Sequence, residues 1–271
     1  MYPLKDKVAV ITGAGSGIGR ALAVELHKKG CRLALCDVND AALAETVALI
    51  PAPVISRAFD VASCDAVSDF AAAVKGELGT AHVVINNAGV AMSQTIEDMS
   101  FEDFEWLMNI NFWGVVYGTK AFLPMLRAQD DGVVVNLSSI FGIIAVPTQG
   151  AYHAAKFAVR GFTETLRQEL EGTGVFAICV HPGGIRTNIV RNSRHYISND
   201  GVTDPALMAR RFEKMARTSP EQAAQVIIDG IERRKPRVLI GADAKLMDRI
   251  QRWMPVSYPS ALRTLLRLAS R

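Results

Sequence analysis

The sequence predicts a single α/β domain, built on a doubly wound parallel sheet of about seven strands with helices on both faces. Short apolar runs rich in Val and Ile alternate along the chain with longer segments of helical period, and each run is nearly continuous in hydrophobicity. Parallel strands buried on both faces have this composition, and the alternation places helices in the crossovers between strands. In such sheets ligands bind at the carboxyl ends of the strands, so we expect the functional site there.

The expected strands are Lys7–Thr12, Arg32–Asp37, Val54–Ala58, His82–Asn86, Gly132–Leu137, Val175–Val180 and Arg237–Ile240. The expected helices fill the gaps at Ile18–Lys29, Ala41–Leu49, 63–77, 101–127, 150–171 and 220–233. We assign residues 1–243 to one dinucleotide-binding type of domain, because no linker, repeat or low-complexity stretch interrupts the alternation. Residues 244–271 are expected to form a basic, amphipathic C-terminal extension.

Composition excludes several classes of protein. With 49 % hydrophobic and 21 % charged residues, the chain is neither disordered nor collagen-like. Its four cysteines form no Cys-x-x-Cys pair and no Cys/His cluster with metal-ligand spacing, so we expect no metal site and a reducing compartment. The first residues contain no apolar signal core, and no apolar stretch reaches the ~18 residues that span a membrane. We therefore expect a cytoplasmic protein.

The net charge of +3 is unevenly distributed. Residues 232–271 contain ten Lys and Arg against three Asp and Glu, a local charge of +7. The rest of the chain is mildly acidic, so overall charge does not indicate a nucleic-acid partner, and we expect none. Six of these ten basic residues lie in the C-terminal extension.

A glycine-rich segment, Thr12–Gly19, lies directly after the first expected strand and before the first helix. Its spacing is G-x-x-x-G-x-G rather than G-x-G-x-x-G, but the physical task is the same. Glycines allow the backbone to turn tightly and to approach a pyrophosphate, whose charge then faces the amino end of the helix. The alternative is a strand–helix turn that binds nothing. We expect a dinucleotide site here, lined by Gly13, Ser16, Gly17, Ile18 and Gly19.

Asp37 ends the second expected strand. A carboxylate at that place accepts both hydroxyls of a ribose and repels a 2′-phosphate. No basic residue follows at Val38 and Asn39, and the glycine loop carries Ser16 where a basic side chain would favour the phosphate. NAD is therefore the expected cofactor, with NADP as the less favoured alternative. Asp37 could instead cap the next helix, although Asn39 or Asp40 is better placed for that role.

Tyr152 and Lys156 lie four residues apart in a segment of helical period, so their side chains share one helix face. A tyrosine has a reference pKa of about 10 and is a poor base near neutrality. A neighbouring cation, together with an oxidised nicotinamide, favours the phenolate and lowers that pKa. Such pairs are common on solvated helices, but Ser139 lies thirteen residues earlier, after the strand Gly132–Leu137. Together the three residues indicate proton transfer to or from an oxygen.

With these motifs the chain resembles the short-chain dehydrogenase/reductase family over roughly residues 4–242. The matching motifs occur in the family's order and spacing: Thr12 to Gly19, Asp60-Val61, Asn86-Asn87-Ala88-Gly89, Asn111, Ser139, Tyr152 with Lys156, and Pro182-Gly183. The resemblance implies a Rossmann-type domain that binds a nicotinamide dinucleotide and moves a hydride between an alcohol and a carbonyl.

The resemblance also implies catalytic roles. Tyr152 would be the general acid/base, and Ser139 would hold the substrate oxygen by a hydrogen bond that strengthens as charge develops. Lys156 would bind the nicotinamide ribose and lower the pKa of Tyr152. Asn111 resembles the family's helix-kink asparagine, which holds a water in a proton relay to bulk solvent. Its alternative is a helix-interior asparagine bonded to backbone, and the two roles are compatible.

Further roles concern the cofactor. The resemblance implies that Asp60 bonds the adenine amine and that Val61 lies beside the adenine ring. It implies a cofactor cleft lined in addition by Tyr152, Lys156, Asn87, Ala88 and Gly89, and a nicotinamide loop formed by Pro182, Gly183, Ile185 and Thr187. His181 stands where a small residue is more usual, and we interpret it as a strand-end histidine without a catalytic role.

The resemblance implies that two segments determine which substrate binds. The first follows Ser139 and offers an apolar wall of Phe141, Ile143, Ile144, Ala145 and Val146. The second, about 188–216, is expected to be a mobile lid that closes over the substrate. It contains Arg191, Arg194, Arg210 and Arg211, for which solvated charges are favoured over contact with a substrate carboxylate. A hydrophobic alcohol or carbonyl compound is the expected small-molecule substrate.

The function expected from all this is an NAD(H)-dependent oxidoreductase that interconverts a secondary alcohol and a ketone, or an alcohol and an aldehyde. The alternatives are an NADP(H)-dependent carbonyl reductase and a non-catalytic dinucleotide-sensing protein on the same fold. Because 101–127 and 150–171 lie where the family builds a subunit interface, we expect a homodimer or homotetramer.

In the C-terminal extension two apolar faces are expected, one formed by Leu246, Ile250, Trp253 and Met254 and the other by Leu262, Leu265, Leu266 and Ala269. Packing on the body or on a partner subunit is the favoured role. Contact of this basic amphipathic segment with a membrane surface is the less favoured alternative.

Overall fold

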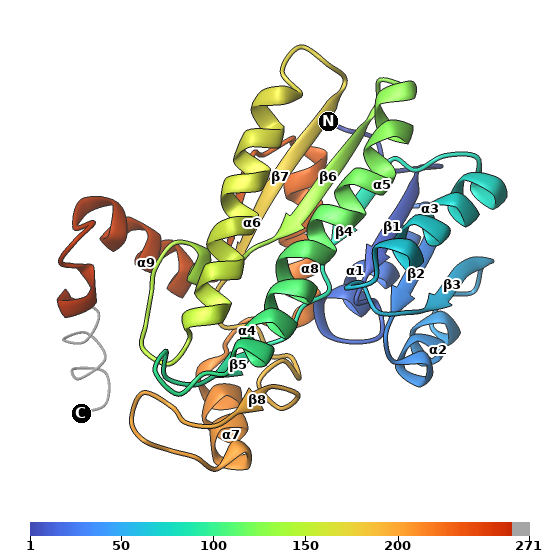
Figure 1. Cartoon of the computed structure of the whole chain (residues 1–271). Helices are drawn as coiled ribbons and strands as arrows, with labels where there is room; N and C mark the ends of the chain where they lie inside the picture. Colours follow the sequence, from blue (N-terminus) through green and yellow to red (C-terminus); the bar gives the residue numbers. More distant parts are fainter. Residues whose placement is uncertain (262–271) are drawn as a thin grey trace.

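The computed structural model describes residues 1–261 and contains a parallel sheet in the order β3-β2-β1-β4-β6-β7-β9 (Figure 1). Its strands are β1 (Val8–Thr12), β2 (Arg32–Asp37), β3 (Val54–Ala58), β4 (Val83–Asn86), β6 (Gly132–Leu137), β7 (Val175–Pro182) and β9 (Arg237–Ile240). The chain moves outward from β1 to β3, returns to pair β4 with β1, and then moves outward on the other side. This reversal between β1 and β4 confirms the doubly wound sheet.

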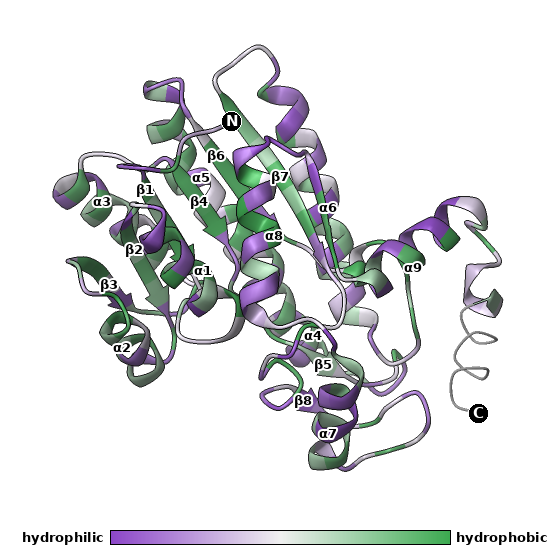
Figure 2. Cartoon of the chain, turned by 180° about the vertical axis from the view of Figure 1, so that it is seen from behind, coloured by the Kyte–Doolittle hydropathy of each residue, from purple (hydrophilic) through white to green (hydrophobic). Residues whose placement is uncertain are grey.

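Helices cover both faces of the sheet (Figures 1 and 2). One face carries α1 (Gly17–Lys28), α2 (Asp40–Ala48) and α8 (Pro220–Glu232), and the other carries α3 (Cys64–Leu78), α5 (Gly114–Ala128) and α6 (Gly150–Glu169). Successive residues of β1 alternate between the two cores: Ala9 and Ile11 pack under α1, whereas Val8 and Val10 pack under α3 and α5. Burial on both faces is the physical reason for the continuous apolar strands.

The expected helix 101–127 is continuous in the structure, but a π-helical turn interrupts its regular α-helical winding in the middle. It is divided into α4 (Phe101–Met108), a π-helical turn (Asn109–Trp113) and α5. The amide of Asn111 donates to the carbonyl of Val90 (2.8 Å), and its oxygen accepts from the Val90 N–H (2.8 Å). These bonds hold the widened turn against the loop after β4. Apolar periodicity misses such a turn, because one inserted residue barely changes the pattern.

A smaller group of elements lies at the carboxyl edge of the sheet (Figure 1). There β5 (Met92–Ser93) pairs in parallel with β8 (Arg194–His195), and α7 (Pro205–Met215) lies beside them. Strands of two residues are too short to produce an alternating pattern, so sequence periodicity did not indicate them. They place the segment 188–216 over the edge where the functional site is expected.

The helix α9 (Ala242–Trp253) begins directly after β9, two residues before the expected start of the C-terminal extension, and we define the extension as beginning with this helix. Packing on the body is confirmed for its described part, but the expected face is wrong. Ala244, Met247 and the later Tyr258 pack on the domain, whereas Leu246 and Trp253 are 52 % and 86 % exposed. The inward face of α9 is held by a largely buried ion pair, described below, as well as by apolar contacts. Hydropathy does not predict such an ion pair.

The second expected apolar face, Leu262 to Ala269, lies outside the described residues. Within residues 1–261 no helix combines the length and the apolar character needed to cross a membrane.

Candidate active site

The glycine-rich loop joins β1 to α1 in a conformation that only glycine tolerates. Gly17 has a φ of +52°, and a Cβ added to Gly19 would lie 2.1 Å from the carbonyl oxygen of Gly13. The loop therefore presents bare backbone at the amino end of α1. A pyrophosphate is recognised by such a surface, since backbone N–H groups and the helix dipole both favour an anion.

The end of β4 is fastened to this loop. The hydroxyl of Thr12 accepts hydrogen bonds from the N–H groups of Asn87 and Ala88, both at 3.0 Å. In return, the side-chain amide of Asn87 donates to the carbonyls of Thr12 (2.9 Å) and Gly13 (3.1 Å). These hydrogen bonds therefore join the carboxyl ends of β1 and β4, the two strands between which the direction of winding reverses.

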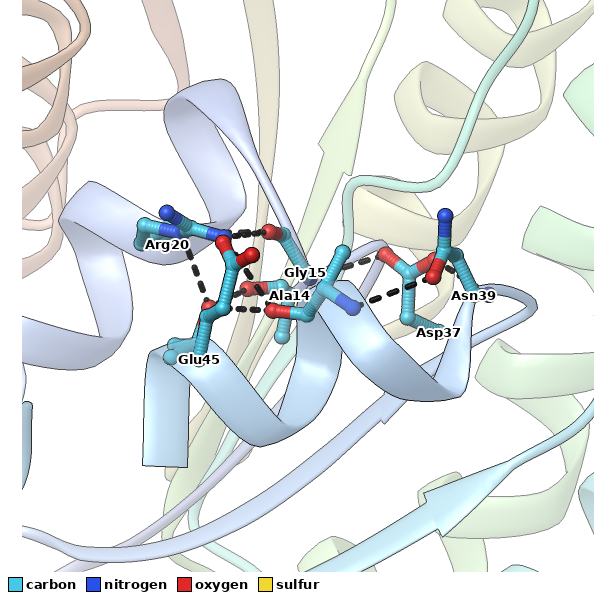
Figure 3. Close-up of polar contacts among 8 residues, drawn as sticks. Ala14, Gly15, Arg20, Asp37, Asn39 and Glu45 are labelled. Carbon is cyan, nitrogen blue, oxygen red and sulfur yellow. Dashed lines mark hydrogen bonds and ion pairs between the residues drawn. The ribbon is translucent and has the colours of Figure 1, made fainter. Parts of the chain in front are cut away.

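Asp37 projects from the end of β2 toward the same loop (Figure 3). Its carboxylate accepts from the N–H of Gly15 (2.8 Å) and from the N–H of Asn39 (2.9 Å). Asn39, and not Asp37, caps α2 by accepting from the N–H of Ala42 (3.0 Å). The capping alternative for Asp37 is therefore wrong, and its carboxylate is held in place beside the glycine loop.

Arg20 secures the other side of the Gly15 peptide (Figure 3). Its guanidinium donates to the Gly15 carbonyl (2.5 and 3.1 Å) and to the hydroxyl of Thr46 (3.0 Å), and it pairs with Glu45 (2.8 Å). Arg20 belongs to none of the motifs recognised in the sequence. The helix dipole disfavours a cation near the amino end of a helix. An arginine at this position therefore indicates that a specific partner compensates for the unfavourable interaction.

The two residues expected at the adenine differ in exposure. Asp60 is exposed, and its carboxylate accepts from the N–H of Ala62 (2.9 Å). Val61 is buried against the start of α5, where a Cβ on Gly114 would lie 2.9 Å from its side chain. A small residue at Gly114 is therefore what lets Val61 sit at this edge.

Ser139, Tyr152 and Lys156 gather at the carboxyl edge, as expected. All three are buried: Ser139 follows β6, and Tyr152 and Lys156 project from one face of α6. The ammonium of Lys156 lies 5.7 Å from the centroid of the Tyr152 ring and donates to the carbonyl of Leu137 (2.9 Å). The edge of the Phe141 ring meets Tyr152 at a centroid distance of 6.2 Å.

Burial governs the titration of this group. It raises the pKa of Tyr152 to about 12, against which hydrogen bonding with Ser139 lowers it. Burial also lowers the pKa of Lys156 to about 8. Among the chain's own groups, the loss of solvation of a phenolate outweighs the hydrogen bond with Ser139. The lowering of the Tyr152 pKa by Lys156 stays a prediction. The phenol is held in its proton-donating form.

Asn111 and Lys156 converge on Gly89. A Cβ at that glycine would lie 3.1 Å from the side-chain oxygen of Asn111 and 3.5 Å from the ammonium of Lys156. Asn111 makes the backbone contacts with Val90 described above, which is the alternative role foreseen for it. The proton relay stays a prediction.

The loop after β7 faces the glycine loop from the opposite side. Ile185 is buried and forms a bridge to Thr218, and the N–H of Gly184 donates to the carboxylate of Asp243 (2.7 Å). A Cβ on Gly17 would lie 3.0 Å from the side chain of Thr187. Pro182 ends β7 and Gly183 begins this loop, which thus leads into a segment that closes over the start of α1.

The segment after Ser139 only partly forms the expected apolar wall. Ile143 and Ile144 are each 1 % exposed and pack on Ile140 and Ala244, so their assignment to the wall is wrong. The C-terminal extension covers them. Phe141 is the member of this group that contacts Tyr152.

Three of the four arginines in the segment 188–216 pair with protein carboxylates. Arg191 pairs with Glu213 (2.7 Å), and Arg211 pairs with Asp200 (2.5 Å). Arg194 pairs with Asp103 of α4 (2.6 Å) and lies over the ring of Trp106. These pairs tie the segment to itself and to α4, and its lid motion stays a prediction.

His181, at the end of β7, is completely buried. Its Nδ1 lies 2.9 Å from the carbonyl of Ser139, to which it donates, and its Nε2 has no partner among the described residues. Burial lowers the pKa of His181 to about 4, so the ring is neutral near pH 7. His181 thus holds the backbone of Ser139, a contact that a strand-end position alone did not indicate.

The chain is similar to known proteins over most of its length. Residues 7–197 match the short chain dehydrogenase family. SadH of Mycobacterium tuberculosis, named as an oxidoreductase, is 49 % identical over 263 residues, which cover 95 % of this chain and 94 % of SadH. The chain belongs to the short-chain dehydrogenase family. It is therefore an enzyme that acts as a dehydrogenase or reductase.

Solved structures agree with this membership. A short-chain dehydrogenase from Burkholderia phymatum, in complex with NAD, is 32 % identical with a TM-score of 0.84, and the match covers 93 % of this chain and 95 % of that one. Levodione reductase is 29 % identical with a TM-score of 0.78, over 87 % of this chain and 95 % of the other. The short-chain dehydrogenase fold thus extends over most of the chain.

The buried His181 predicts an acid-sensitive fold. Its unfolded-state pKa is about 6.5, so below that value the unfolded chain binds a proton that the folded chain refuses until about pH 4. Stability is fully present above pH 6.5 and is lost as the pH falls toward 4, by roughly 2 kcal/mol at pH 5 from this residue. In urea unfolding at about pH 7 and about pH 5, His181→Asn should lose less stability on acidification than wild type.

His27→Asn, at the end of α1, controls for the loss of a histidine elsewhere. An unchanged acid sensitivity in His181→Asn would contradict the assignment of a neutral, buried ring.

Proposed function

We propose that this short-chain dehydrogenase interconverts a secondary alcohol and a ketone, or an alcohol and an aldehyde, with NAD(H) as the hydride carrier. One observation carries the proposal: Ser139, Tyr152 and Lys156 are buried together at the sheet edge that also presents the glycine loop. A nucleotide-sensing protein has no need to bury a phenol and an ammonium side by side. The full set favours catalysis over sensing.

The proposed chemistry uses the protonation states described above. In reduction, the neutral phenol of Tyr152 gives its proton to the carbonyl oxygen as that oxygen gains charge, and the hydroxyl of Ser139 donates a hydrogen bond to the same oxygen. In oxidation, Tyr152 takes the proton from the alcohol. The nicotinamide, when bound, supplies or accepts the hydride. Lys156, at 5.7 Å from the ring centroid, stabilises the phenolate that remains after proton donation.

The glycine cradle and the placement of Asp37 fit a nicotinamide dinucleotide, and they favour NAD. The Asp37 carboxylate is fixed by two backbone N–H groups and keeps lone pairs for ribose hydroxyls. Arg20 is committed to the Gly15 carbonyl and to Glu45 and is not free for a 2′-phosphate. The NAD complex of the related Burkholderia phymatum enzyme is consistent with this choice.

A hydrophobic substrate is supported by the surroundings of Tyr152. Its side chain belongs to an apolar cluster with Met92 and Leu107, against which Val90 and Phe141 pack while partly exposed. The named activity of levodione reductase makes carbonyl reduction a reasonable direction to assay. We propose a small lipophilic alcohol or carbonyl compound.

A homodimer or homotetramer is proposed through α4, α5 and α6. Trp113 and Phe157 are 43 % and 41 % exposed, and Trp113 stacks on Tyr117 at a centroid distance of 5.8 Å. Exposed aromatic side chains on adjoining helices are typical of subunit interfaces. Membrane contact by the extension is still the less favoured proposal, since Ala244 and Tyr258 pack its described part on the domain.

Removal of the phenol hydroxyl tests the chemistry. Tyr152→Phe should lower kcat by roughly 10²–10⁴-fold, because the general acid/base is lost while the apolar packing stays. Titration of NADH by fluorescence should show nearly unchanged binding. Tyr117→Phe is a matched control on α5 and should keep wild-type turnover. Full activity of Tyr152→Phe on an alcohol that wild type oxidises would refute the mechanism.

Removal of one charge tests the cofactor preference. Asp37→Asn keeps an acceptor beside Gly15 but removes the repulsion of a 2′-phosphate. We expect the ratio of NADP to NAD dissociation constants to fall about tenfold, which corresponds to about 1.4 kcal/mol. Asp40→Asn, three residues away on α2, should leave the ratio unchanged. Equal binding of both cofactors by the wild-type enzyme would contradict the assignment.

Introduction of negative charge into the aromatic surface tests the assembly. A Trp113→Glu, Phe157→Glu double variant should be a monomer in light scattering coupled to size exclusion, because two carboxylates would have to be buried on association. Leu49→Glu, directly after α2, is a control that places a carboxylate on an exposed apolar position elsewhere. A wild-type mass that survives the double substitution would exclude this face as the interface.

A further inference from the structure

The loop that follows Ser139 is held by three side chains from three different elements. His181 of β7 donates to the Ser139 carbonyl, as described above. His153 of α6 contacts the Phe141 carbonyl through Nδ1 (2.9 Å) and accepts at Nε2 from the N–H of Val146 (2.9 Å). These two contacts come from the domain itself and fix both ends of the loop.

The third contact comes from the C-terminal extension. The hydroxyl of Tyr258 accepts from the N–H of Ala145 at 2.8 Å. Tyr258 is half-buried and also packs with Met247 and Ala244 on the side chains of Ile143 and Ile144. The middle of the loop is therefore bound, through backbone and side chains, to a segment that lies more than a hundred residues later in the chain.

The extension is anchored firmly enough to act as a fixed support. Asp248 of α9 is buried and pairs with Arg237 of β9 (2.6 Å) and with Arg252 (3.1 Å). An ion pair that is largely removed from solvent is costly to separate, because one partner would stay buried and unpaired. This anchor joins α9 to the last strand of the sheet and sets the position from which Tyr258 reaches the loop.

The same extension contacts a second loop of the site. Asp243, at the start of α9, accepts from the N–H of Gly184, and a Cβ on Gly183 would lie 2.3 Å from its carboxylate. The extension thus touches both the loop after Ser139 and the loop after β7. These are the two segments between which a substrate would approach Tyr152.

We propose that Tyr258 is a positioning residue that preorganises the loop 140–146 and thereby determines how well bulky substrates bind. The proposal rests on the alcohol–carbonyl activity proposed above. A bulky substrate binds to one conformation of this loop. Without the contact to Tyr258, the loop would have to become ordered when the substrate binds, and this loss of entropy would weaken binding. A small alcohol that reaches only Ser139 and Tyr152 does not depend on the middle of the loop.

Tyr258→Phe in the full-length enzyme removes the hydroxyl and keeps the ring. Hydrogen exchange followed by mass spectrometry should show about fivefold faster exchange in the peptide containing Ala145, with unchanged exchange in β1 and β4. The KM for a bulky secondary alcohol should rise by about fivefold. The KM for a small secondary alcohol and kcat for both should stay at wild-type values. Tyr117→Phe serves as the matched control in both measurements.

Unchanged exchange at Ala145 would overturn the positioning role. Faster exchange with no selective effect on the bulky alcohol would overturn the role in substrate binding. If wild type oxidises neither alcohol, the proposed function fails by itself, and the exchange measurement still decides whether Tyr258 holds the loop.

Discussion

The pairing of β1 with β4 is the constraint on which the rest of the site depends. At this pair the direction of winding reverses, so the loops after β1 and β4 diverge to opposite sides and leave backbone available between them. Thr12 and Asn87 join the two loops by hydrogen bonds at this point. This strand pair sets the positions of the glycine loop, the end of β2 and the end of β6. It thereby also sets the positions of the residues that these segments carry.

Burial is what gives the gathered groups their chemical character. Removal from solvent keeps Tyr152 protonated, brings the pKa of Lys156 to about 8, and keeps His181 neutral. Each change disfavours the charged form, as expected for groups in a medium of low polarisability. Burial of His181 also lowers the stability of the fold at acidic pH. The burial that gives the site its protonation states therefore narrows the pH range in which the chain is stable.

Local patterns in the sequence predicted the sheet, its order of elements and the residues gathered at its edge. The strands are continuous apolar runs, and Ser139, Tyr152 and Lys156 lie in motifs whose spacing is short. Contacts between distant segments were not predictable in this way. Arg20 binding to Gly15, His181 to the Ser139 carbonyl, and Tyr258 to Ala145 depend on how helices and strands are placed in space, and no periodicity records that.

The loop after Ser139 shows how contacts between distant segments change the candidate site. Ile143 and Ile144 lie four and five residues after Ser139, and their hydrophobicity suggested a substrate surface, yet α9 covers them. A loop without regular structure leaves backbone groups unpaired, and buried backbone groups need partners. His181, His153 and Tyr258 supply those partners for this loop. Because the third partner belongs to the extension, the conformation of the loop beside Tyr152 depends on a segment that family motifs do not describe.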